Sequence, residues 1–403
     1  MRGSQEARHS ETFAPGRGSP TRCPAVTIDN RARGLTSQIL AGRAVTGAAA
    51  ARVMIDGQPY LNFFGSGYLA LTDEPRIREA ARQALEGGAP FARQFASALG
   101  ATDPIFDEVE QLGAAACGTE SSVYFASGYL IGAVGIASLA QSFQLLFLDA
   151  NAHYSLEDAA KATGLPRFQF IHGDPDSLKE QLRQHVRGQQ RPLVLTDGVF
   201  ATTGYIPPLA DYAAALAPYD GRMFVDESHG FGVVGEHGRG AIEYCAVESF
   251  ATAGATLSKA YCTQGAVMGC TVERATMLQT LPPIRAACAG SPLSAAAATA
   301  SLRFVAQHPE LRVNLRATTA YFRARMRELG LDVIESPAPI ISFRLGSQAE
   351  MLALQRRLFD QGIFIYHSTY IGAGTEGVIR CAVFRDHTRE DIDHLTSALR
   401  QSA

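Results

Sequence analysis

Short apolar runs alternate with longer amphipathic stretches through the middle of this 403-residue chain. The runs are rich in β-branched or aromatic residues, and polar residues or glycine follow them directly. We expect six of them to be strands: Ser122–Ala126, Leu145–Asp149, Phe168–Ile171, Leu193–Thr196, Met223–Asp226 and Val267–Thr271. Strands that alternate with helices are typical of a mainly parallel sheet covered by helices. The pattern therefore predicts an α/β fold with ligands at the carboxyl ends of the strands.

Amphipathic spacing predicts the helices on either side of this region. Residues 74–86 and 104–115 have the spacing of helices with one buried face. The stretch 295–330, rich first in alanine and then in arginine, predicts long helices that lead to a C-terminal part. In that part we expect strands at Ile340–Leu345 and Val378–Val383 and helices at 350–361 and 388–402.

These elements and the length of the chain predict four parts. Residues 1–30 are rich in Gly, Ser, Pro and Arg and have no long apolar run, so we expect a disordered leader. An N-terminal segment, residues 31–92, precedes a large domain, residues 93–296, which is expected to contain the parallel sheet. A smaller α+β domain, residues 297–403, completes the chain.

Composition excludes several classes of partner. The formal net charge of −3 gives no electrostatic basis for binding nucleic acid or an anionic membrane. No apolar run approaches the ~20 residues that span a membrane. The seven cysteines are scattered and never form a Cys-x-x-Cys pair. They indicate free thiols in a reducing cytoplasm, with no metal site and no disulfide.

Lys259 is the most informative single residue, because the chain has only two other lysines, Lys161 and Lys179. Arginine supplies nearly all of the positive charge, so charge alone does not explain a lysine among the small and hydroxyl residues of 255–260. A lysine amine condenses with an aldehyde, as in the Schiff base of pyridoxal phosphate (PLP) enzymes, and an arginine does not. The alternative is a lysine that extends over the surface of a helix.

A carboxylate at the end of a predicted strand offers a partner for such a cofactor. Asp226 ends the run Met223–Asp226, and His229 follows three residues later. An aspartate there can keep a pyridine nitrogen protonated, and His229 can donate a hydrogen bond to the phenolate oxygen of the ring. An acidic cap on the strand beside a hydrogen-bonded histidine explains the pair equally well.

Two further segments follow predicted strands. His153 lies just beyond the second one, where its flat ring can stack on a cofactor ring, although a loop histidine without that role is common. Ser127, Gly128 and Tyr129 join the first strand to a predicted helix, and backbone N–H groups at a helix start suit a phosphate. Thr256 can add a hydroxyl group to the same phosphate.

Arg380 is a single charge within the apolar strand pattern Val378–Val383. A substrate carboxylate held by two parallel hydrogen bonds would satisfy this guanidinium. A structural ion pair is the alternative, and the sequence favours neither interpretation.

Together, these residues and several longer motifs resemble the α-oxoamine synthase family of fold-type I PLP-dependent acyltransferases. The resemblance runs from Gly57 to the C-terminus in these segments: Gly67–Leu71, Ala126–Tyr129, Val225–His229, Gly235–Gly240, Thr256–Ala260 and His387–Asp393. Other segments look most like the synthases of α-aminoketone and α-hydroxyketone autoinducers: Tyr68–Leu71, Thr102–Pro104, Ala152–Leu156, Asp226–His229 and Ile379–Arg380. The family implies a large PLP-binding domain and a smaller C-terminal domain.

The resemblance implies catalytic roles for four residues. Lys259 would form the Schiff base with the cofactor, and Asp226 would contact its pyridine nitrogen. His229 would contact its phenolate oxygen, and His153 would stack on its ring.

The remaining candidates are implied at the edges of the cofactor. Ser127, Gly128, Tyr129 and Thr256 would lie near its phosphate. Ser66 stands where the family has an asparagine close to the substrate amino acid. The residues assigned to the substrate are Ser66, Tyr68 and Arg380.

The resemblance implies that a small α-amino acid and an acyl-CoA or acyl-carrier thioester are joined with loss of CO2, which gives an α-aminoketone. It also implies a homodimer in the cytoplasm. Two alternatives stay open: another fold-type I PLP reaction, such as transamination or elimination, and a non-catalytic subunit of a heterodimer. Such a subunit is expected to lack the lysine, so Lys259 favours an enzyme.

Overall fold

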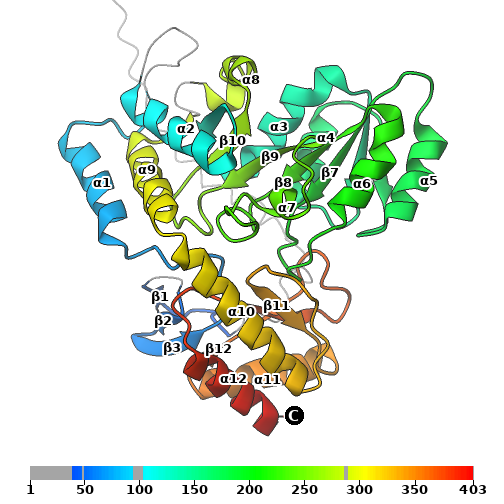
Figure 1. Ribbon diagram of the computed structural model, residues 1–403. Helices are drawn as coiled ribbons and strands as arrows, with labels where there is room; N and C mark the ends of the chain where they lie inside the picture. The colour runs from blue at the N-terminus through cyan, green and yellow to red at the C-terminus, as the bar shows by residue number, and fades with distance from the viewer. Residues whose placement is uncertain (1–38, 48–49, 94–102, 286–288, 403) are drawn as a thin grey trace, which may run out of the picture.

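The computed structural model describes residues 39–47, 50–93, 103–285 and 289–402. The expected leader, residues 1–30, lies outside these ranges. The described residues form a seven-stranded, a four-stranded and a three-stranded sheet with helices around them (Figure 1). This arrangement confirms the predicted α/β fold.

The seven-stranded sheet has the order β4-β10-β9-β8-β7-β5-β6, and β10 is antiparallel to both of its neighbours. The other neighbouring strands run parallel. Its strands are β4 (Ser121–Phe125), β5 (Leu145–Asp149), β6 (Arg167–Phe170), β7 (Pro192–Asp197), β8 (Arg222–Asp226), β9 (Ala251–Thr256) and β10 (Ala266–Cys270). All six expected strands are present, with ends displaced by at most one residue. The sequence did not predict β9, because its small residues form no apolar run.

Alternate residues of these strands pack on opposite faces of the sheet, as the pleat requires. On one face, residues such as Leu146 and Leu195 pack with the helices α3 (Ile131–Leu139) and α4 (Tyr154–Ala162). On the other face, residues such as Phe147 pack with other helices. These are α5 (Pro175–His185), α6 (Leu209–Leu216) and α7 (Ala241–Tyr244). The sheet is therefore buried on both sides, and its strand ends are the places where polar side chains gather.

The N-terminal strands join the C-terminal part of the chain. Strands β1 (Val45–Thr46), β2 (Arg52–Ile55) and β3 (Gln58–Asn62) form one sheet with β12 (Ile363–Phe364), which lies parallel to β3. The three-stranded sheet consists of β11 (Ile340–Phe343), β14 (Val378–Ala382) and β13 (Tyr366–Ser368). The predicted boundaries between the four parts stay a prediction.

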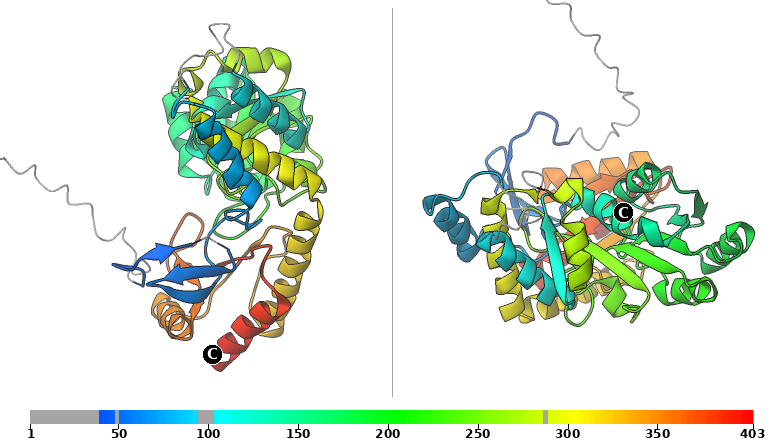
Figure 2. Two further views of the ribbon diagram at one scale, coloured as in Figure 1. Left: turned by 90° about the vertical axis from the view of Figure 1, so that its left-hand side faces the viewer. Right: turned by 90° about the horizontal axis from the view of Figure 1, so that it is seen from above.

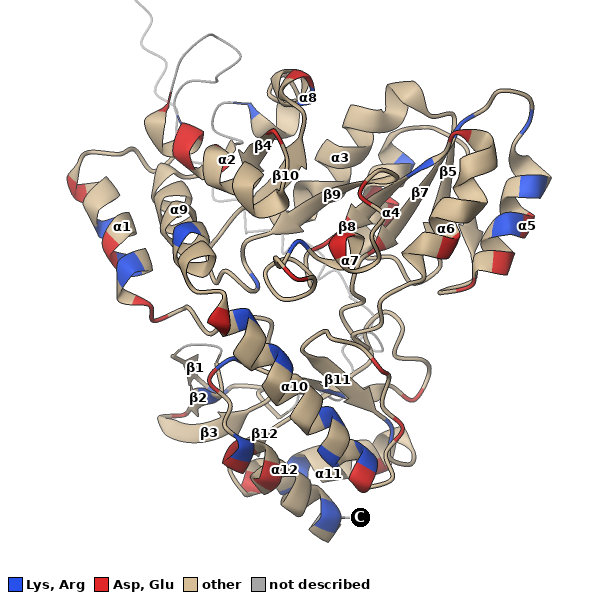
Figure 3. Cartoon of the chain, viewed as in Figure 1, with Lys and Arg blue, Asp and Glu red and all other residues tan. Residues whose placement is uncertain are grey.

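The remaining helices connect and cover these sheets. They are α1 (Pro75–Glu86), α2 (Pro104–Cys117), α8 (Val272–Leu278), α9 (Pro292–Gln307), α10 (Glu310–Glu328), α11 (Gln348–Asp360) and α12 (Arg389–Ser402). Helix α9 packs beside α1 and α2, and α10 runs from there down to the C-terminal sheet (Figure 2). The helices predicted from amphipathic spacing are all present. Charged side chains gather on outer helices such as α1, α5, α10 and α12, whereas the strands are mostly uncharged (Figure 3).

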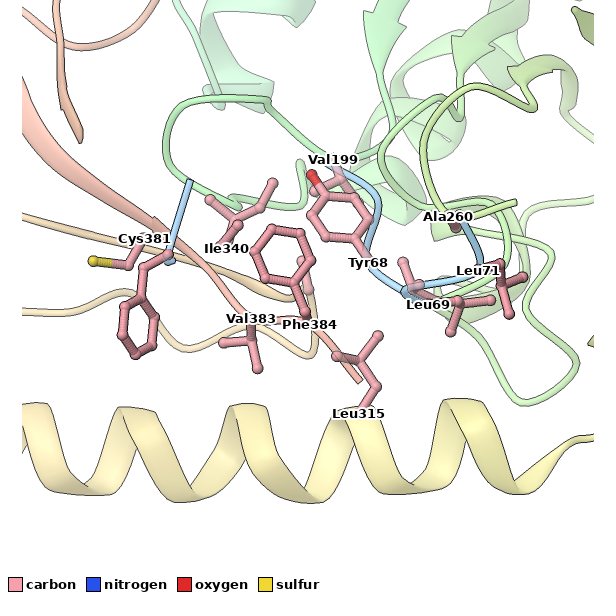
Figure 4. Close-up of a cluster of buried hydrophobic side chains, with 14 of the residues drawn as sticks. Tyr68, Leu69, Leu71, Val199, Ala260, Leu315, Ile340, Cys381, Val383 and Phe384 are labelled. Atoms are coloured by element: carbon pink, nitrogen blue, oxygen red, sulfur yellow. The ribbon is translucent and has the colours of Figure 1, made fainter. Parts of the chain in front are cut away.

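A cluster of buried side chains holds the C-terminal sheet against the loops of the large sheet (Figure 4). Val199 follows β7 and Ala260 follows Lys259, so both belong to loops at the carboxyl edge of the large sheet. They share one core with Tyr68 and with Ile340 and Val383 from the C-terminal part. This packing fixes the position of the two parts at the edge where the candidate residues lie.

Gly135 provides a test of how closely α3 packs on the sheet. A Cβ at this position would overlap the ring of Phe224 on β8. Gly135→Ala would favour the isolated helix by about 1 kcal/mol, but the overlap in the core costs about 1–3 kcal/mol. We expect a net loss of stability, measured by denaturant unfolding. The same substitution in a Phe224→Leu background is expected to cost less, and equal costs in both backgrounds would contradict the overlap.

Candidate active site

Two adjoining cavities open at the carboxyl ends of the parallel strands. The smaller has a volume of about 190 Å³ and the larger about 500 Å³. Both are lined by His153, His229 and Lys259, so these three side chains form their shared boundary. The fold thus brings together residues that are more than a hundred positions apart in the sequence.

Asp226 is the last residue of β8 and lines the smaller cavity, where only 4% of its surface is exposed. Its Oδ1 accepts a hydrogen bond of 2.9 Å from the backbone N–H of Ser228. Asp197, the last residue of β7, is its register partner in the neighbouring strand and lines the same cavity. Two carboxyl groups therefore lie side by side at this edge.

Lys259 reaches the cavities from the turn that connects β9 to β10. The turn is closed by backbone hydrogen bonds from Leu257 to Gly265 and from Thr263 to Leu257. Burial lowers the pKa of the Lys259 amine to about 8, although the neighbouring acidic residues, Asp226 foremost, oppose this shift. A larger fraction of this amine than of an ordinary lysine is therefore neutral near pH 7.

A buried hydroxyl group connects His229 to Arg380. The hydroxyl oxygen of Tyr68 lies 2.6 Å from Nδ1 of His229, and Nη2 of Arg380 donates to the same oxygen at 3.4 Å. Arginine has no acceptor atom, so Nδ1 of His229 is the acceptor that these two contacts offer to the hydrogen of the Tyr68 hydroxyl group, and we assign the tautomer of His229 on this basis. Burial, aided by Lys259, Arg380 and His153, holds the pKa of His229 well below its ordinary value. The neutral ring then keeps its hydrogen on Nε2.

His153 caps the N-terminus of α4, where its Nδ1 accepts a hydrogen bond of 3.2 Å from the N–H of Ser155. Its own backbone N–H donates to Oδ2 of Asp197 at 2.8 Å. Burial lowers the pKa of the His153 ring, and Lys259 adds to this effect while Asp226 opposes it. Both cavity histidines thus favour the neutral form near pH 7.

The turn after β4 forms the wall of the smaller cavity beside the end of β9. Ser127, Gly128 and Tyr129 line the smaller cavity together with Thr256 and Ser258. A Cβ at Gly128 would lie 2.6 Å from the Cβ of Thr256, so only glycine allows these two segments to approach each other so closely. The Oγ atom of Ser127 accepts the N–H of Tyr129 and caps the short helical turn that leads into α3.

Arg380 lies in the larger cavity and is 7% exposed. Its Nε donates to the carbonyl oxygen of Ala201 at 2.7 Å, and its Nη1 donates to that of Gly65 at 3.1 Å. No carboxylate of the described residues lies within ion-pair distance of its guanidinium. The two backbone contacts fix the orientation of the guanidinium. Its positive charge has no acidic partner in the described part of the chain.

The predicted residues divide between the two cavities, with one exception. Ser66 and Arg380 line the larger cavity, and the predicted cofactor residues line the smaller. Tyr68 lies on neither wall. It is fully buried behind His229 and Arg380, so it acts through these two side chains.

Sequence reasoning missed several wall residues. Asp197 ends a predicted strand as Asp226 does, so the same strand-end argument could have found it. The aromatic walls of the larger cavity carry no comparable signal, because single aromatic residues are common in every core. These missed aromatic residues are Phe64, Tyr366 and Tyr370.

Comparison with known proteins assigns the family. The model of the family "Aminotransferase class I and II" matches residues 63–399. The chain is 30% identical to the 8-amino-7-oxononanoate synthase of Geotalea daltonii, over 89% of this chain and 92% of that protein. It is 32% identical to that of Methylococcus capsulatus, over 86% and 90% respectively.

The chain belongs to the aminotransferase class I and II family, among its α-oxoamine synthases. The fold agrees with this assignment. A serine palmitoyltransferase from S. paucimobilis, solved with bound PLP–myriocin, superposes with a TM-score of 0.84 at 22% identity. The superposition covers 94% of this chain and 98% of that one. The resemblance inferred from the sequence motifs is confirmed for the family, and the autoinducer-synthase branch stays a prediction.

The lowered pKa of Lys259 leads to a test on the protein without added ligands. Reductive methylation with formaldehyde modifies neutral amines, so the rate of Lys259 methylation, followed by peptide mass spectrometry, is expected to reach half of its maximum near pH 8. The exposed amine of Lys179 serves as the control, because its ion pair with Asp176 raises its pKa. If Lys259 and Lys179 are modified over the same pH range, the cavity does not favour a neutral amine.

Proposed function

We propose that this α-oxoamine synthase joins a small α-amino acid to an acyl thioester, with release of CO2 and a free thiol, to give an α-aminoketone. One observation carries the proposal. Lys259, whose pKa is lowered, shares the smaller cavity with Asp226 and two neutral histidines. The adjoining larger cavity contains an arginine that has no acidic partner in the described chain. The relatives named 8-amino-7-oxononanoate synthase support the same class of reaction.

The smaller cavity fits PLP. The tight contact between Gly128 and Thr256 holds two segments together on its wall, and the hydroxyl-bearing residues Ser127, Thr256 and Ser258 line it. Ser127, Tyr129 and Thr256 would hold the phosphate, as polar groups at a helix start suit an anion. Lys259 would bind the aldehyde carbon. When bound, PLP supplies an electron sink for the negative charge that develops on the substrate.

The chain's own residues would tune this site through hydrogen bonds and charge. The carboxylate of Asp226 would hold a proton on the pyridine nitrogen by a charge-assisted hydrogen bond. His229 would offer its Nε2–H to the phenolate oxygen, since Tyr68 occupies its Nδ1. The ring of His153, fixed at the start of α4, would lie against the cofactor ring.

Lys259 and Arg380 would act on the amino acid. The neutral Nζ of Lys259 would take the proton from Cα, which the lowered pKa of the amine makes feasible near neutral pH. The guanidinium of Arg380 would hold the substrate carboxylate until it leaves as CO2. The small residues Ser66 and Ala201 on the wall of the larger cavity leave room for a short side chain.

The acyl thioester would enter through the larger cavity. Phe64 and Tyr366 pack against each other with ring centroids 4.3 Å apart, and Tyr370 lies further along the same wall. These aromatic surfaces suit an apolar acyl chain, because burying each methylene contributes up to about 0.8 kcal/mol. Either CoA or a carrier protein is a possible donor of the acyl group.

The wider setting belongs to the same proposal. We propose a closed two-fold homodimer, as the family resemblance implies, and a cytoplasmic location. Five cysteines of the described residues are free thiols, which supports a reducing compartment. Among the described residues, no helix has both the length and the apolar character needed to cross a membrane.

The reaction itself is the first test. Incubation of the PLP-loaded protein with L-alanine or 2-aminobutyrate and a series of acyl-CoAs should release equal amounts of thiol and CO2. Lys259→Ala is expected to lower turnover by at least about 10³-fold, because no other lysine lies near the cavity. Transfer of the amino group to a keto acid, without thiol release, would instead support transamination. A wild-type protein that loads PLP but releases no thiol would contradict the proposal.

Arg380→Lys tests the carboxylate contact. Lysine keeps the positive charge but cannot form two parallel hydrogen bonds with a carboxylate. The KM for the amino acid is expected to rise about tenfold or more, since a hydrogen bond to a charged group contributes about 1.5–3 kcal/mol. The KM for the acyl-CoA should change much less.

Arg344→Lys is the matched control, because Arg344 also donates to backbone carbonyl groups but lies outside both cavities. It is expected to leave both KM values close to those of the wild type. Equal rises of both KM values in Arg380→Lys would show that Arg380 only supports the structure.

A further inference from the structure

Asp197 is a buried acid at the candidate site to which neither the sequence motifs nor the proposed reaction assigns a role. It ends β7 as Asp226 ends β8, and the two residues are register partners. Partners in adjacent parallel strands project from the same face of the sheet, about 4.8 Å apart along the hydrogen-bonding direction. Only 5% of Asp197 and 4% of Asp226 is exposed.

Each carboxyl group uses one oxygen for a backbone contact. Oδ2 of Asp197 accepts the N–H of His153 at 2.8 Å, and Oδ1 of Asp226 accepts the N–H of Ser228 at 2.9 Å. The second oxygen of each makes no hydrogen bond with the described residues. Both carboxyl groups line the smaller cavity, so both second oxygens are available to a proton or to a ligand.

The surrounding charges do not allow both carboxyl groups to be ionised without cost. One cation, Lys259, lines the cavity with them, and it is attracted to Asp226 more strongly than to Asp197. Burial and the neighbouring Asp226 raise the pKa of Asp197 well above its ordinary value. The titratable or charged groups that face Asp197 from the neighbouring elements are Asp149, His153, Asp226, Lys259 and Tyr370.

Asp149, the third acid near Asp197, lies outside both cavities. Its side chain is fully buried, lies 2.8 Å from Nδ1 of His172 and accepts two backbone N–H groups. Both of its oxygens are therefore engaged by contacts of its own, away from the pair of Asp197 and Asp226.

We propose that Asp197 carries the proton of a buried acid–carboxylate pair with Asp226 and leaves Asp226 as the only carboxylate anion facing the smaller cavity. Asp197 is thus a positioning residue: it anchors His153 through the backbone, and its neutral state reserves the negative charge for the ring nitrogen of the cofactor. The proposal deepens the function proposed above and rests on it for its catalytic meaning.

The proton on Asp197 can be tested on the protein without PLP. The unfolded chain releases this proton near pH 3.9, whereas the folded protein keeps it to higher pH. Raising the pH through this window therefore lowers the stability of the wild type. Asp197→Asn resembles the protonated acid and cannot ionise, so its Tm relative to wild type is expected to increase as the pH rises from about 4 to about 8.

Two further variants separate the proton from the hydrogen bond. Asp197→Ala also removes the contact with His153, so its Tm should be lower than that of Asp197→Asn at every pH. Its Tm difference from the wild type should nevertheless change with pH as steeply as that of Asp197→Asn. Asp211→Asn, the same substitution on the exposed side of α6, should follow the wild-type curve. A constant Tm difference between Asp197→Asn and wild type across this pH range would overturn the proposal.

The PLP-loaded protein provides the second measurement. Asp197→Asn is expected to keep the visible absorbance of the wild type and a turnover within about tenfold, whereas Asp226→Asn should lose both. If Asp197→Asn fails as severely as Asp226→Asn, Asp197 acts as an anion and the proposal is wrong. The Tm measurement does not depend on the reaction. A failure of the proposed function can therefore be distinguished from a failure of the proposed protonation of Asp197.

Discussion

The candidate site depends on the placement of ionisable groups at the carboxyl edge of a sheet that is buried on both faces. Away from bulk water, a charged group needs a compensating partner or changes its protonation state. Here the chain supplies two carboxyl groups, one lysine and two histidines around a cavity of about 190 Å³. Burial lowers the pKa of Lys259 to about 8 and that of both histidines, so the histidines favour the neutral form and the neutral fraction of the lysine rises above that of an ordinary lysine.

Chain topology makes this arrangement possible. Strands β5, β7, β8 and β9 run parallel, so the segments that follow them all leave the sheet at one edge. The antiparallel β10 returns the chain after the lysine turn, and its pairing with β4 brings the turn containing Gly128 beside Thr256. The polar lining of the smaller cavity and the buried amine of Lys259 thus come from neighbouring strand ends.

The second part of the molecule completes the site from the other side. Arg380 comes from β14, and Tyr68 from the segment after β3. The core shown in Figure 4 holds Tyr68 and Cys381, the neighbour of Arg380 in β14, against the loops of the large sheet. The hydroxyl group of Tyr68 then connects the arginine expected to bind the substrate with the histidine expected to contact the cofactor. A shift between the two parts would therefore disturb the contact of Tyr68 with His229 and that of Arg380 with Ala201 together.

The sequence by itself determined six of the seven strands of the large sheet, the amphipathic helices and the family. Apolar runs and amphipathic spacing reflect local burial, and motifs such as those around Lys259 and Asp226 are contiguous along the chain. Only the tertiary structure decided which residues meet across strands. The pairing of Asp197 with Asp226 depends on strand order and register, and the position of Tyr68 depends on packing between distant segments. Strand β9 has no apolar pattern of its own and forms because β8 and β10 offer it hydrogen-bonding partners on both sides.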